Sequence, residues 1–416
     1  MIKTIQRSSV SGVVSAPPSK SLTQRAIAAA LLARGKTVIS NPSFCNDSLA
    51  ALKMAERLGA SVSTGEDYFE LNGSSEALSE VFLNCGESGL ALRMFSPIAA
   101  LLSRRCTLTG EGSLLKRPVS MITDALSKLG IPAESDKGFL PVSINGTLKG
   151  GMIEIDGSSG SQVLTGLLLA LPCVETDSEI RVLNLKSKPY IDLTLKLLDD
   201  FGIYVENRGY TRFVIPGKQV YKARNYCVEG DWSGSAFLLV AGALAGDVTV
   251  NNLQTGSRQA DAAILEALGR AGAEVKIEND SVRTVKSELK SFSFDATESP
   301  DLFPPLAALA SGCSGTTSIK GVSRLEHKES NRALTITRVL NELGVGVQVT
   351  GDEMMIAGGA VTGATVSSFN DHRIAMMASV AALTCKGSVT VTEAEAVSKS
   401  YPGFYDDLKN LNADIR

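Results

Sequence analysis

The chain has 416 residues and a formal net charge of -3, with 44% hydrophobic and 20% charged residues. This balance excludes a disordered chain and a strongly basic nucleic-acid-binding protein, so any anion site must come from local placement of Lys and Arg. The length exceeds what a single hydrophobic core usually supports, which predicts two domains.

Targeting and redox signals are weak. The N-terminus, Met1 to Arg7, lacks the apolar stretch of a signal peptide, and the apolar run from Ala26 to Ala33 is too short to cross a membrane. The seven cysteines are odd in number and form no C-x-x-C pair, so we expect small buried thiols rather than disulfides or a zinc framework. These observations predict a cytoplasmic protein without membrane partners.

A repeat organises the chain. An apolar residue followed by Gly, and then by a strand-like stretch, recurs at spacings of 68 to 72 residues. Gly after the last apolar turn is the usual helix C-terminal residue, because it adopts the left-handed backbone conformation without steric cost, and Asn is the common substitute. The endings are Leu58-Gly59, Leu129-Gly130, Phe201-Gly202, Ala271-Gly272, Leu343-Gly344 and Leu411-Asn412.

A second element recurs in phase with these endings. Each unit contains a run that is apolar nearly all round, which predicts a helix buried on every side. A β-rich stretch follows, and a polar loop leads into an amphipathic helix. We therefore predict six α/β units with two helices each, three in each domain; two landmarks in phase disfavour chance spacing. The runs are 28–32, 98–102, 167–171, 238–244, 306–309 and 378–383.

The loops before the buried helices combine small polar residues with basic ones, as in Ser19-Lys20-Ser21 and Asp371-His372-Arg373. A helix N-terminus offers free N–H groups and a partial positive charge, which suits an anion. Ordinary N-capping explains any single loop equally well. Six such N-termini close together would instead favour anion binding.

Loops before the amphipathic helices add cations at a corresponding place in the unit, as at 116–118, 186–190 and 328–332. No Walker-type or dinucleotide-binding glycine motif is present, and only His327 and His372 could offer imidazole to a metal. The pattern favours a small, multiply anionic substrate held by Lys and Arg, with no metal and no cofactor.

These residues resemble the enolpyruvyl transferase family, and within it the 5-enolpyruvylshikimate-3-phosphate synthases, over the whole chain. Such enzymes transfer the enolpyruvyl group of phosphoenolpyruvate to the 5-hydroxyl of shikimate 3-phosphate and release phosphate, in the shikimate pathway to chorismate and aromatic amino acids. Nine short motifs in one order carry the resemblance: Ser19-Lys20-Ser21 with Arg25, Arg117-Pro118, Ser161-Gln162, 187–192, 228–231, Pro300-Asp301, Lys328-Glu329 with Arg332, 370–373 and 399–402.

The resemblance implies a two-domain α/β fold. Each domain would have three β-α-β-α-β-β repeats around buried helices, an inside-out α/β barrel, with the active site in the interdomain cleft. Residues 17–229 would form one domain, with much of the shikimate-phosphate site. Residues 1–16 and 230–416 would form the other, with Asp301, Glu329, His372 and Lys399. We expect a monomer whose partners are the two small substrates.

The resemblance also implies roles for single residues. Asp301 would accept the proton of the attacking hydroxyl, Glu329 with Lys20 would handle the proton on the methylene carbon, and His372 would support that transfer. Shikimate 3-phosphate would be bound by Lys20, Ser21, Arg25, Ser161, Gln162, Ser187, Tyr190, Asp301 and Lys328. Phosphoenolpyruvate would be bound by Lys20, Gly89, Arg117, Gln162, Arg332, Arg373 and Lys399.

Four positions depart from the family pattern. Glu87 stands where Asn is usual, and its carboxylate would either pair with Arg93 or Arg117 or weaken the binding of phosphoenolpyruvate by repulsion. We favour the pairing. The other departures are Gly160 for a phosphate-binding Ser, Arg324 for an Asn, and the bulky Trp232.

Two alternatives remain. A sister enzyme transfers enolpyruvyl to a UDP-linked amino sugar, but its family carries a Lys-Asn pair and a reactive loop Cys, where this chain has Lys20-Ser21 and no Cys beside Arg117. A non-catalytic anion-binding protein on the same fold would have no use for Asp301 and Glu329 facing a substrate. A phosphate-release assay separates all three.

Overall fold

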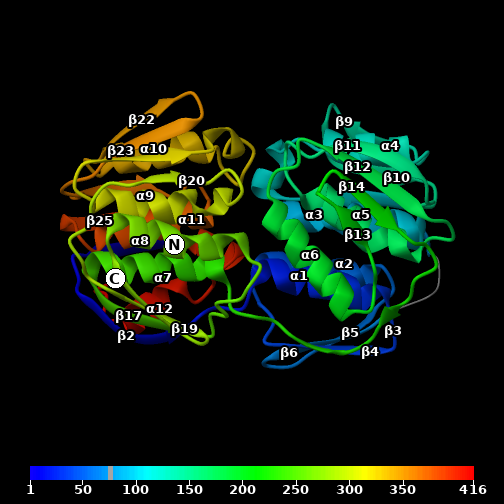
Figure 1. Ribbon diagram of the computed structural model, residues 1–416, viewed down its shortest axis with the longest axis horizontal. Coiled ribbons are helices and arrows are strands. Elements are labelled where there is room, and N and C mark those ends of the chain that lie inside the picture. Colours follow the sequence, from blue (N-terminus) through cyan, green and yellow to red (C-terminus); the bar gives the residue numbers. More distant parts are fainter. Residues whose placement is uncertain (74–77) are drawn as a thin grey trace. The chain divides into compact units, whose positions relative to one another are not determined.

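The computed structural model describes residues 1–73 and 78–416, which form an α/β fold and so confirm the predicted class (Figure 1). The chain divides into two compact units, Lys20–Val228 and Met1–Ser19 with Glu229–Arg416. It passes between them after Ser19 and after Val228. The sequence had led us to expect these crossings after residues 16 and 229.

The unit Lys20–Val228 contains three four-stranded sheets of one topology. In each sheet a parallel pair continues into antiparallel neighbours. Parallel neighbours need a crossover, and helices supply it in two of the sheets. In sheet order the strands are β16 (Asn225–Cys227), β4 (Lys36–Ser40), β6 (Tyr68–Asn72), β5 (Ser61–Thr64); β7 (Leu78–Asn84), β8 (Ser103–Thr109), β10 (Phe139–Asn145), β9 (Ala133–Asp136); and β11 (Met152–Asp156), β12 (Ser178–Leu183), β14 (Arg212–Ile215), β13 (Glu206–Arg208), while β3 (Ala33–Arg34) pairs with β15 (Tyr221–Lys222).

Three helices of this unit are buried on nearly every side, because their sequences offer almost no polar face. They are α1 (Lys20–Leu32), α3 (Gly89–Leu102) and α5 (Gln162–Ala170), and α3 packs against both others. The remaining helices are amphipathic and bury one face: α2 (Asn46–Arg57), α4 (Ser120–Lys128) and α6 (Lys188–Asp200).

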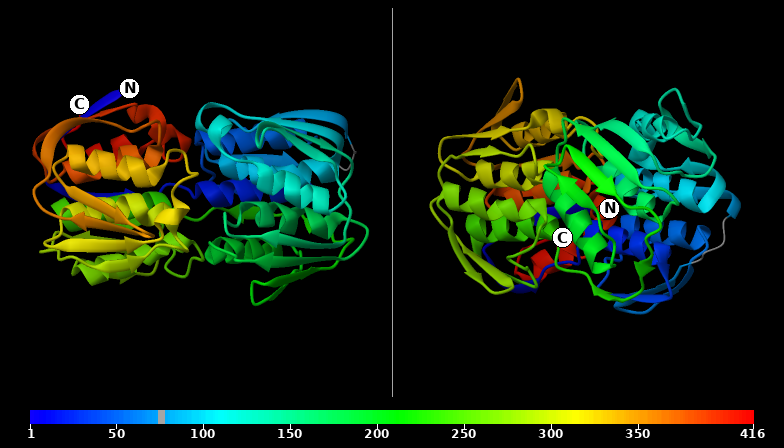
Figure 2. Two further views of the ribbon diagram at one scale, coloured as in Figure 1. Left: turned by 90° about the horizontal axis from the view of Figure 1, so that it is seen from above. Right: turned by 45° about the vertical axis from the view of Figure 1, so that its right-hand side comes forward.

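The second unit contains two four-stranded sheets of this kind and one three-stranded sheet. Both N-terminal strands belong to it: β2 (Val10–Ser15) is parallel to β17 (Gly246–Asn251), and β1 (Ile2–Gln6) is antiparallel to β25 (Lys386–Thr392). The two chain ends therefore lie together, and Ile5 bridges Ile415 (Figure 2). The sheets are β18 (Glu274–Glu278), β19 (Ser281–Val285), β17 (Gly246–Asn251), β2 (Val10–Ser15); β20 (Ser293–Asp295), β21 (Thr316–Lys320), β23 (Glu353–Ala357), β22 (Gly346–Thr350); and β1 (Ile2–Gln6), β25 (Lys386–Thr392), β24 (Thr362–Ser367).

Three buried helices form the centre of this unit, and each packs against the other two. They are α7 (Trp232–Ala245), α9 (Phe303–Ser311) and α11 (His372–Ala382). Every residue of α7, α9 and α11 is buried. The amphipathic helices are α8 (Ile264–Ala271), α10 (Arg332–Glu342) and α12 (Phe404–Asn410).

The six predicted helix endings all have the expected backbone. Gly59, Gly130, Gly202, Gly272 and Gly344 have φ between 74° and 100°, and Asn412 has φ 70°. This is the left-handed region in which Gly meets no steric penalty and Asn is tolerated. The prediction of Gly and Asn as helix-ending residues is confirmed.

In the described residues, no helix is long and apolar enough to cross a membrane. All seven cysteines lie in this part of the chain and are free. Five are buried as expected, but Cys173 is partly exposed and Cys227 is exposed, so the expectation of buried thiols was wrong for these two. Cys227 ends the short strand β16, where alternate side chains point outward.

Candidate active site

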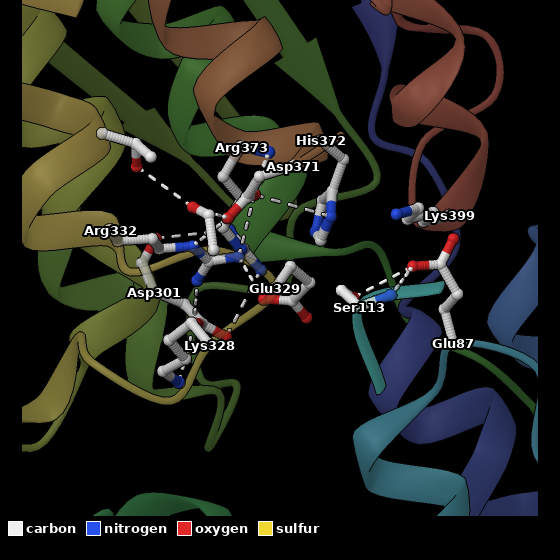
Figure 3. A network of polar contacts seen from close by, with 12 residues as sticks. Glu87, Ser113, Asp301, Lys328, Glu329, Arg332, Asp371, His372, Arg373 and Lys399 are labelled. Atoms are coloured by element: carbon white, nitrogen blue, oxygen red, sulfur yellow. Dashed lines mark hydrogen bonds and ion pairs between the residues drawn. The ribbon is translucent and has the colours of Figure 1, made fainter. Parts of the chain in front are cut away.

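The polar centre of the second unit is the side chain of Arg332, the first residue of α10. Its Nε donates to Asp371 Oδ2 at 2.9 Å and its Nη1 to Asp301 Oδ1 at 2.9 Å. Its Nη2 donates to Glu329 Oε2 at 2.6 Å (Figure 3). Burial alone would lower the pKa of Arg332, but the carboxylates of Asp371, Glu329 and Asp301 raise it above its ordinary value. One permanent cation thus links three carboxylates.

Asp301 lies in the 3₁₀ turn η4 (Pro300–Leu302) that leads into α9. Besides Arg332, its carboxylate accepts from Lys328 Nζ at 3.1 Å and Arg373 Nη2 at 3.4 Å. Burial would raise the pKa of Asp301, yet the charges of Arg373, Lys328 and Arg332 hold it well below its ordinary value. Asp301 is therefore an ionised carboxylate.

Burial also acts on Lys328. It lowers the pKa of the Lys328 ammonium, an effect that Asp301 opposes and the nearby charges of Arg332 and Arg324 reinforce. Arg324, one of the departures from the family pattern, lies in the 3₁₀ turn η5 (Val322–Arg324) of the same unit. This departure therefore adds a positive charge to the surroundings of Lys328.

Residues at the start of α11 complete the cluster. Asp371 caps the helix, and its Oδ1 accepts from the Arg373 backbone N–H at 2.9 Å. The buried His372 has Nδ1 3.9 Å from the same oxygen (Figure 3). The Lys399 Nζ donates to the Asn370 carbonyl at 2.7 Å. Lys399 ends the 3₁₀ helix η6 (Ala394–Lys399). The start of α11 thus brings Asp371, His372 and Arg373 together, and Lys399 bonds to the residue before Asp371.

In the unit Lys20–Val228, α1 begins at Lys20, whose Nζ donates to Asp47 Oδ2 at 3.0 Å. Both side chains are mostly buried, 14% and 10% exposed. One turn later Arg25 is buried, with Nη1 donating to the Ser21 carbonyl at 3.0 Å and Nε to Thr194 Oγ1 at 3.0 Å. Burial lowers the pKa of Arg25 to about 10, so it stays charged at neutral pH.

Two helix starts of this unit carry the expected phosphate-binding residues. Ser187 has φ 61° and precedes α6, and Arg25 Nη2 donates to the Tyr190 carbonyl at 3.5 Å. Ser161, also buried, precedes α5. Its neighbour Gly160 has φ 132°, a conformation that a Ser would adopt only with strain, so the backbone explains this departure.

Gly89, the first residue of α3, lies against two guanidinium groups. A Cβ built on it would lie 2.6 Å from Arg117 Nη1 and 2.7 Å from Arg93 Nη1. Arg93 Nη1 donates to Gln162 Oε1 at 3.1 Å and to the Gly89 carbonyl at 3.2 Å. The missing side chain therefore admits both cations, and Gln162 is held beside them.

Glu87 makes a contact that neither sequence alternative included. Its Oε2 accepts from both Ser113 N and Ser113 Oγ at 2.9 Å (Figure 3). Ser113 lies in the 3₁₀ helix η1 (Gly112–Lys116), which ends directly before Arg117.

Trp232, the last departure, is buried at the start of α7, and its Nε1 donates to the Gln254 carbonyl at 3.1 Å.

Sequence reasoning assigned no role to several residues that hold these side chains. Asp47 and Asp371 lie in or before the first turn of a helix, where an acidic residue is ordinarily explained by the helix dipole or by capping. Thr194 and Ser113 resemble surface hydroxyls. Arg93 was considered only as a partner for Glu87. Asp371 alone lay inside a quoted motif, 370–373, which was a signal that could have identified it.

The sequence matches the family model of EPSP synthase (3-phosphoshikimate 1-carboxyvinyltransferase) over residues 5–408. A 3-phosphoshikimate 1-carboxyvinyltransferase of Methanocorpusculum labreanum is 38% identical, covering 99% of both chains. One of Clostridium kluyveri is 37% identical, covering 99% of this chain and 97% of its own.

Solved structures are similar to this chain over its whole length. An EPSP synthase of Acinetobacter baumannii superposes with a TM-score of 0.83 at 26% identity, covering 100% of this chain and 99% of its own. The enolpyruvyl transferase NikO of Streptomyces tendae has a TM-score of 0.79 at 19% identity, covering 100% of this chain and 98% of its own, a likeness of fold. On the family match and the full-length relatives, the chain belongs to the EPSP synthase family.

Proposed function

We propose that the protein transfers the enolpyruvyl group of phosphoenolpyruvate to the 5-hydroxyl of shikimate 3-phosphate and releases phosphate. The observation that carries this proposal is the shared contact of Asp301 and Glu329 with the buried Arg332. The reaction needs an acid and a base on opposite sides of the reacting carbons. Two carboxylates held by one cation, with Lys328 and Arg373 beside them, provide such a pair.

The proposed reaction has two balanced stages. A proton adds to the methylene carbon of phosphoenolpyruvate, the hydroxyl oxygen bonds to the adjacent carbon, and Asp301 takes the hydroxyl proton. The tetrahedral intermediate then breaks its C–O bond to phosphate while a proton leaves the methyl group, which yields the enol ether. Glu329, together with Lys20, delivers and removes the proton at carbon, and His372 supports this transfer. Neither stage needs a metal ion.

The pKa of Asp301 is low without substrates, but substrate binding would change the surroundings of its carboxylate in a way that suits acceptance of the hydroxyl proton. Its carboxylate is ionised because Arg373, Lys328 and Arg332 surround it. Bound anions would compete for the same cations, and a carboxylate that loses cationic partners becomes more basic. Substrate binding would therefore raise the pKa of Asp301 toward a value suited to accepting a proton.

The proposed binding groups come from both units of the chain. Arg25, Ser21, Ser161, Gln162, Ser187 and Tyr190 would bind shikimate 3-phosphate, together with Lys20, Asp301 and Lys328. Lys20, Gly89, Arg117, Gln162, Arg332, Arg373 and Lys399 would bind phosphoenolpyruvate and stabilise the leaving phosphate. We propose three β-α-β-α-β-β repeats per unit, an inside-out barrel, and a substrate site in the interdomain cleft.

Phosphate release with phosphoenolpyruvate tests the function. We expect turnover with shikimate 3-phosphate and none with UDP-N-acetylglucosamine as the acceptor. The variant Asp301→Asn should lose turnover, whereas Asp295→Asn, which changes an exposed aspartate of the same unit, should keep it. Turnover with the UDP sugar would assign the sister reaction. Binding of both substrates without phosphate release would identify a non-catalytic protein.

A further inference from the structure

A buried aspartate, Asp261, lies close to Arg373, which is proposed to bind phosphoenolpyruvate. Asp261 belongs to the 3₁₀ turn η3 (Ala260–Ala263) and is 3% exposed. Its carboxylate accepts a hydrogen bond from the Ser233 hydroxyl. The same Ser233 oxygen accepts from Arg373 Nη2 at 2.8 Å. The three side chains therefore form a continuous line, Asp261 to Ser233 to Arg373.

The neighbouring backbone holds this line in place. Ser233 is the second residue of α7, and its backbone N–H donates to Asp231 Oδ1 at 2.8 Å. Gln259, two residues before Asp261, accepts from the Trp232 N–H at 3.1 Å and donates to the Gly230 carbonyl at 2.7 Å. The turn that carries Asp261 is thus bonded to the chain on the N-terminal side of Ser233.

We propose that Asp261 is a positioning residue for the reaction, because its carboxylate orients the Ser233 hydroxyl so that this oxygen anchors Arg373. The proposal rests on the proposed function, in which Arg373 binds phosphoenolpyruvate. A hydroxyl has one hydrogen to donate and two lone pairs that accept. When the hydrogen points to Asp261, the lone pairs are available to the Arg373 guanidinium. Arg373 is then fixed next to Asp301, the proton acceptor.

Protonation of Asp261 would reverse this orientation. The neutral carboxyl group can donate to Ser233, whose hydrogen must then turn elsewhere and compete with the N–H of Arg373. Burial raises the pKa of Asp261 to about 6, and the nearby charges of Asp301 and Asp231 act in the same direction. Arg373 and the hydrogen bond from Ser233 oppose them. The anchor should therefore weaken as the pH falls through about 6.

Two variants test this anchor by steady-state kinetics. Ser233→Ala removes the oxygen that binds Arg373 and should raise the KM for phosphoenolpyruvate by about tenfold, as expected for one lost bond to a charged group. Asp261→Asn should raise the same KM by a smaller factor, because an amide oxygen still accepts from Ser233. Both should leave the KM for shikimate 3-phosphate near that of the wild type. The control is Asp247→Asn, an exposed aspartate paired with Arg283.

Two further readouts separate positioning from a general structural role. If Asp261 acts through Ser233, the double variant Asp261→Asn/Ser233→Ala should match Ser233→Ala alone, whereas independent effects would add. The pH profile of kcat/KM for phosphoenolpyruvate should lose one acid ionisation near pH 6 in Asp261→Asn only. The substrate phosphate titrates in a similar range, but its contribution is common to wild type, Asp247→Asn and Asp261→Asn.

The outcomes are distinct. The positioning role would be overturned if the effects of the two substitutions added in the double variant. It would also be overturned if Asp261→Asn had the KM and pH profile of the wild type. In either case, turnover by the wild type would leave the proposed function intact. If Asp261→Asn does not fold, an unchanged KM in Ser233→Ala overturns the role equally. Absence of phosphate release by the wild type would overturn the proposed function and this inference with it.

Discussion

Arg332 and Asp371 are joined by two hydrogen bonds, from Nε to Oδ2 at 2.9 Å and from Nη2 to Oδ1 at 3.2 Å, and both side chains are almost completely buried. The planar fork of the guanidinium matches the two carboxylate oxygens. Because Asp371 also caps α11 and Arg332 begins α10, this pair connects two helix starts. The contact fixes the cation that Asp301 and Glu329 share.

The first prediction concerns this pair. Asp371→Asn leaves the Arg332 charge buried with one carboxylate fewer, which should cost about 3–5 kcal/mol in the free energy of unfolding. The matched control is Asp247→Asn, where a similar two-point contact with Arg283 is exposed and its loss should be hardly measurable. Urea denaturation of the wild type, Asp371→Asn and Asp247→Asn measures both losses in the free energy of unfolding. Equal losses in the two variants would contradict a structural role for the buried pair.

The second prediction concerns pH and Asp261. The pKa of Asp261 is about 6 in the folded protein and near the ordinary aspartate value of 3.8 when unfolded, so the folded state binds more protons between these values. Its contribution to stability should therefore fall as the pH rises from about 4 through 6. Asp301, whose pKa is lowered, contributes in the opposite direction at lower pH. Asp261→Asn should remove only the first effect, as unfolding curves at several pH values would show.

The third prediction concerns metals. In the described residues, no group of three or more His, Cys, Asp or Glu side chains could hold a metal ion. The proposed reaction uses protons and fixed cations instead. Exhaustive chelation should leave phosphate release unchanged. Activity that is lost on chelation and returns only with a divalent ion would contradict the proposed mechanism.

Local features of the fold were predictable because their causes are local. The ending at Leu58-Gly59 and its five counterparts depend on one backbone conformation that Gly adopts without strain. The buried helices follow from runs without a polar face. The exact crossing after Ser19 was not predictable, because the loop residues before it carry no signal that distinguishes one position from the next.

Contacts within the candidate site were harder to predict, because they join residues far apart in the sequence. Arg25 bonds to Thr194, 169 residues away, and Ser233 bonds to Asp261, 28 residues away. Nothing near Thr194 or Asp261 distinguishes it from other polar residues. Their partners are determined by helix packing, which a single sequence does not reveal.

The fourth prediction concerns Gly89. In Gly89→Ala the new methyl group would meet the ends of the Arg117 and Arg93 side chains rather than backbone, so both can move. We therefore expect a small change in melting temperature but a several-fold higher KM for phosphoenolpyruvate. The control is Gly256→Ala, where a Cβ meets nothing within 4 Å. A large loss of stability in Gly89→Ala, with KM unchanged, would show that the two arginines cannot yield and that they do not bind this substrate.

The last prediction concerns Glu87, whose carboxylate accepts two hydrogen bonds from Ser113. A Cβ on Gly112 would lie 2.4 Å from Glu87 Oε2, so the carboxylate packs closely on η1, the helix that leads into Arg117. Glu87 thereby connects the loop before α3 to the turn that carries a proposed phosphoenolpyruvate ligand. Replacing it changes either the charge or the connection, and two substitutions separate these effects.

Glu87→Gln removes the charge but keeps a carbonyl oxygen that can accept from Ser113, so the melting temperature and the KM for phosphoenolpyruvate should stay close to the wild type. Glu87→Ala removes the connection and should cost about 1 kcal/mol of stability while raising that KM, because Arg117 loses a fixed neighbour. A lower KM in Glu87→Gln with an unchanged melting temperature would show instead that the carboxylate repels the substrate. A higher KM with clear destabilisation in Glu87→Gln would show that its charge pairs with an arginine, since Gln keeps an oxygen that can accept from Ser113 but carries no charge.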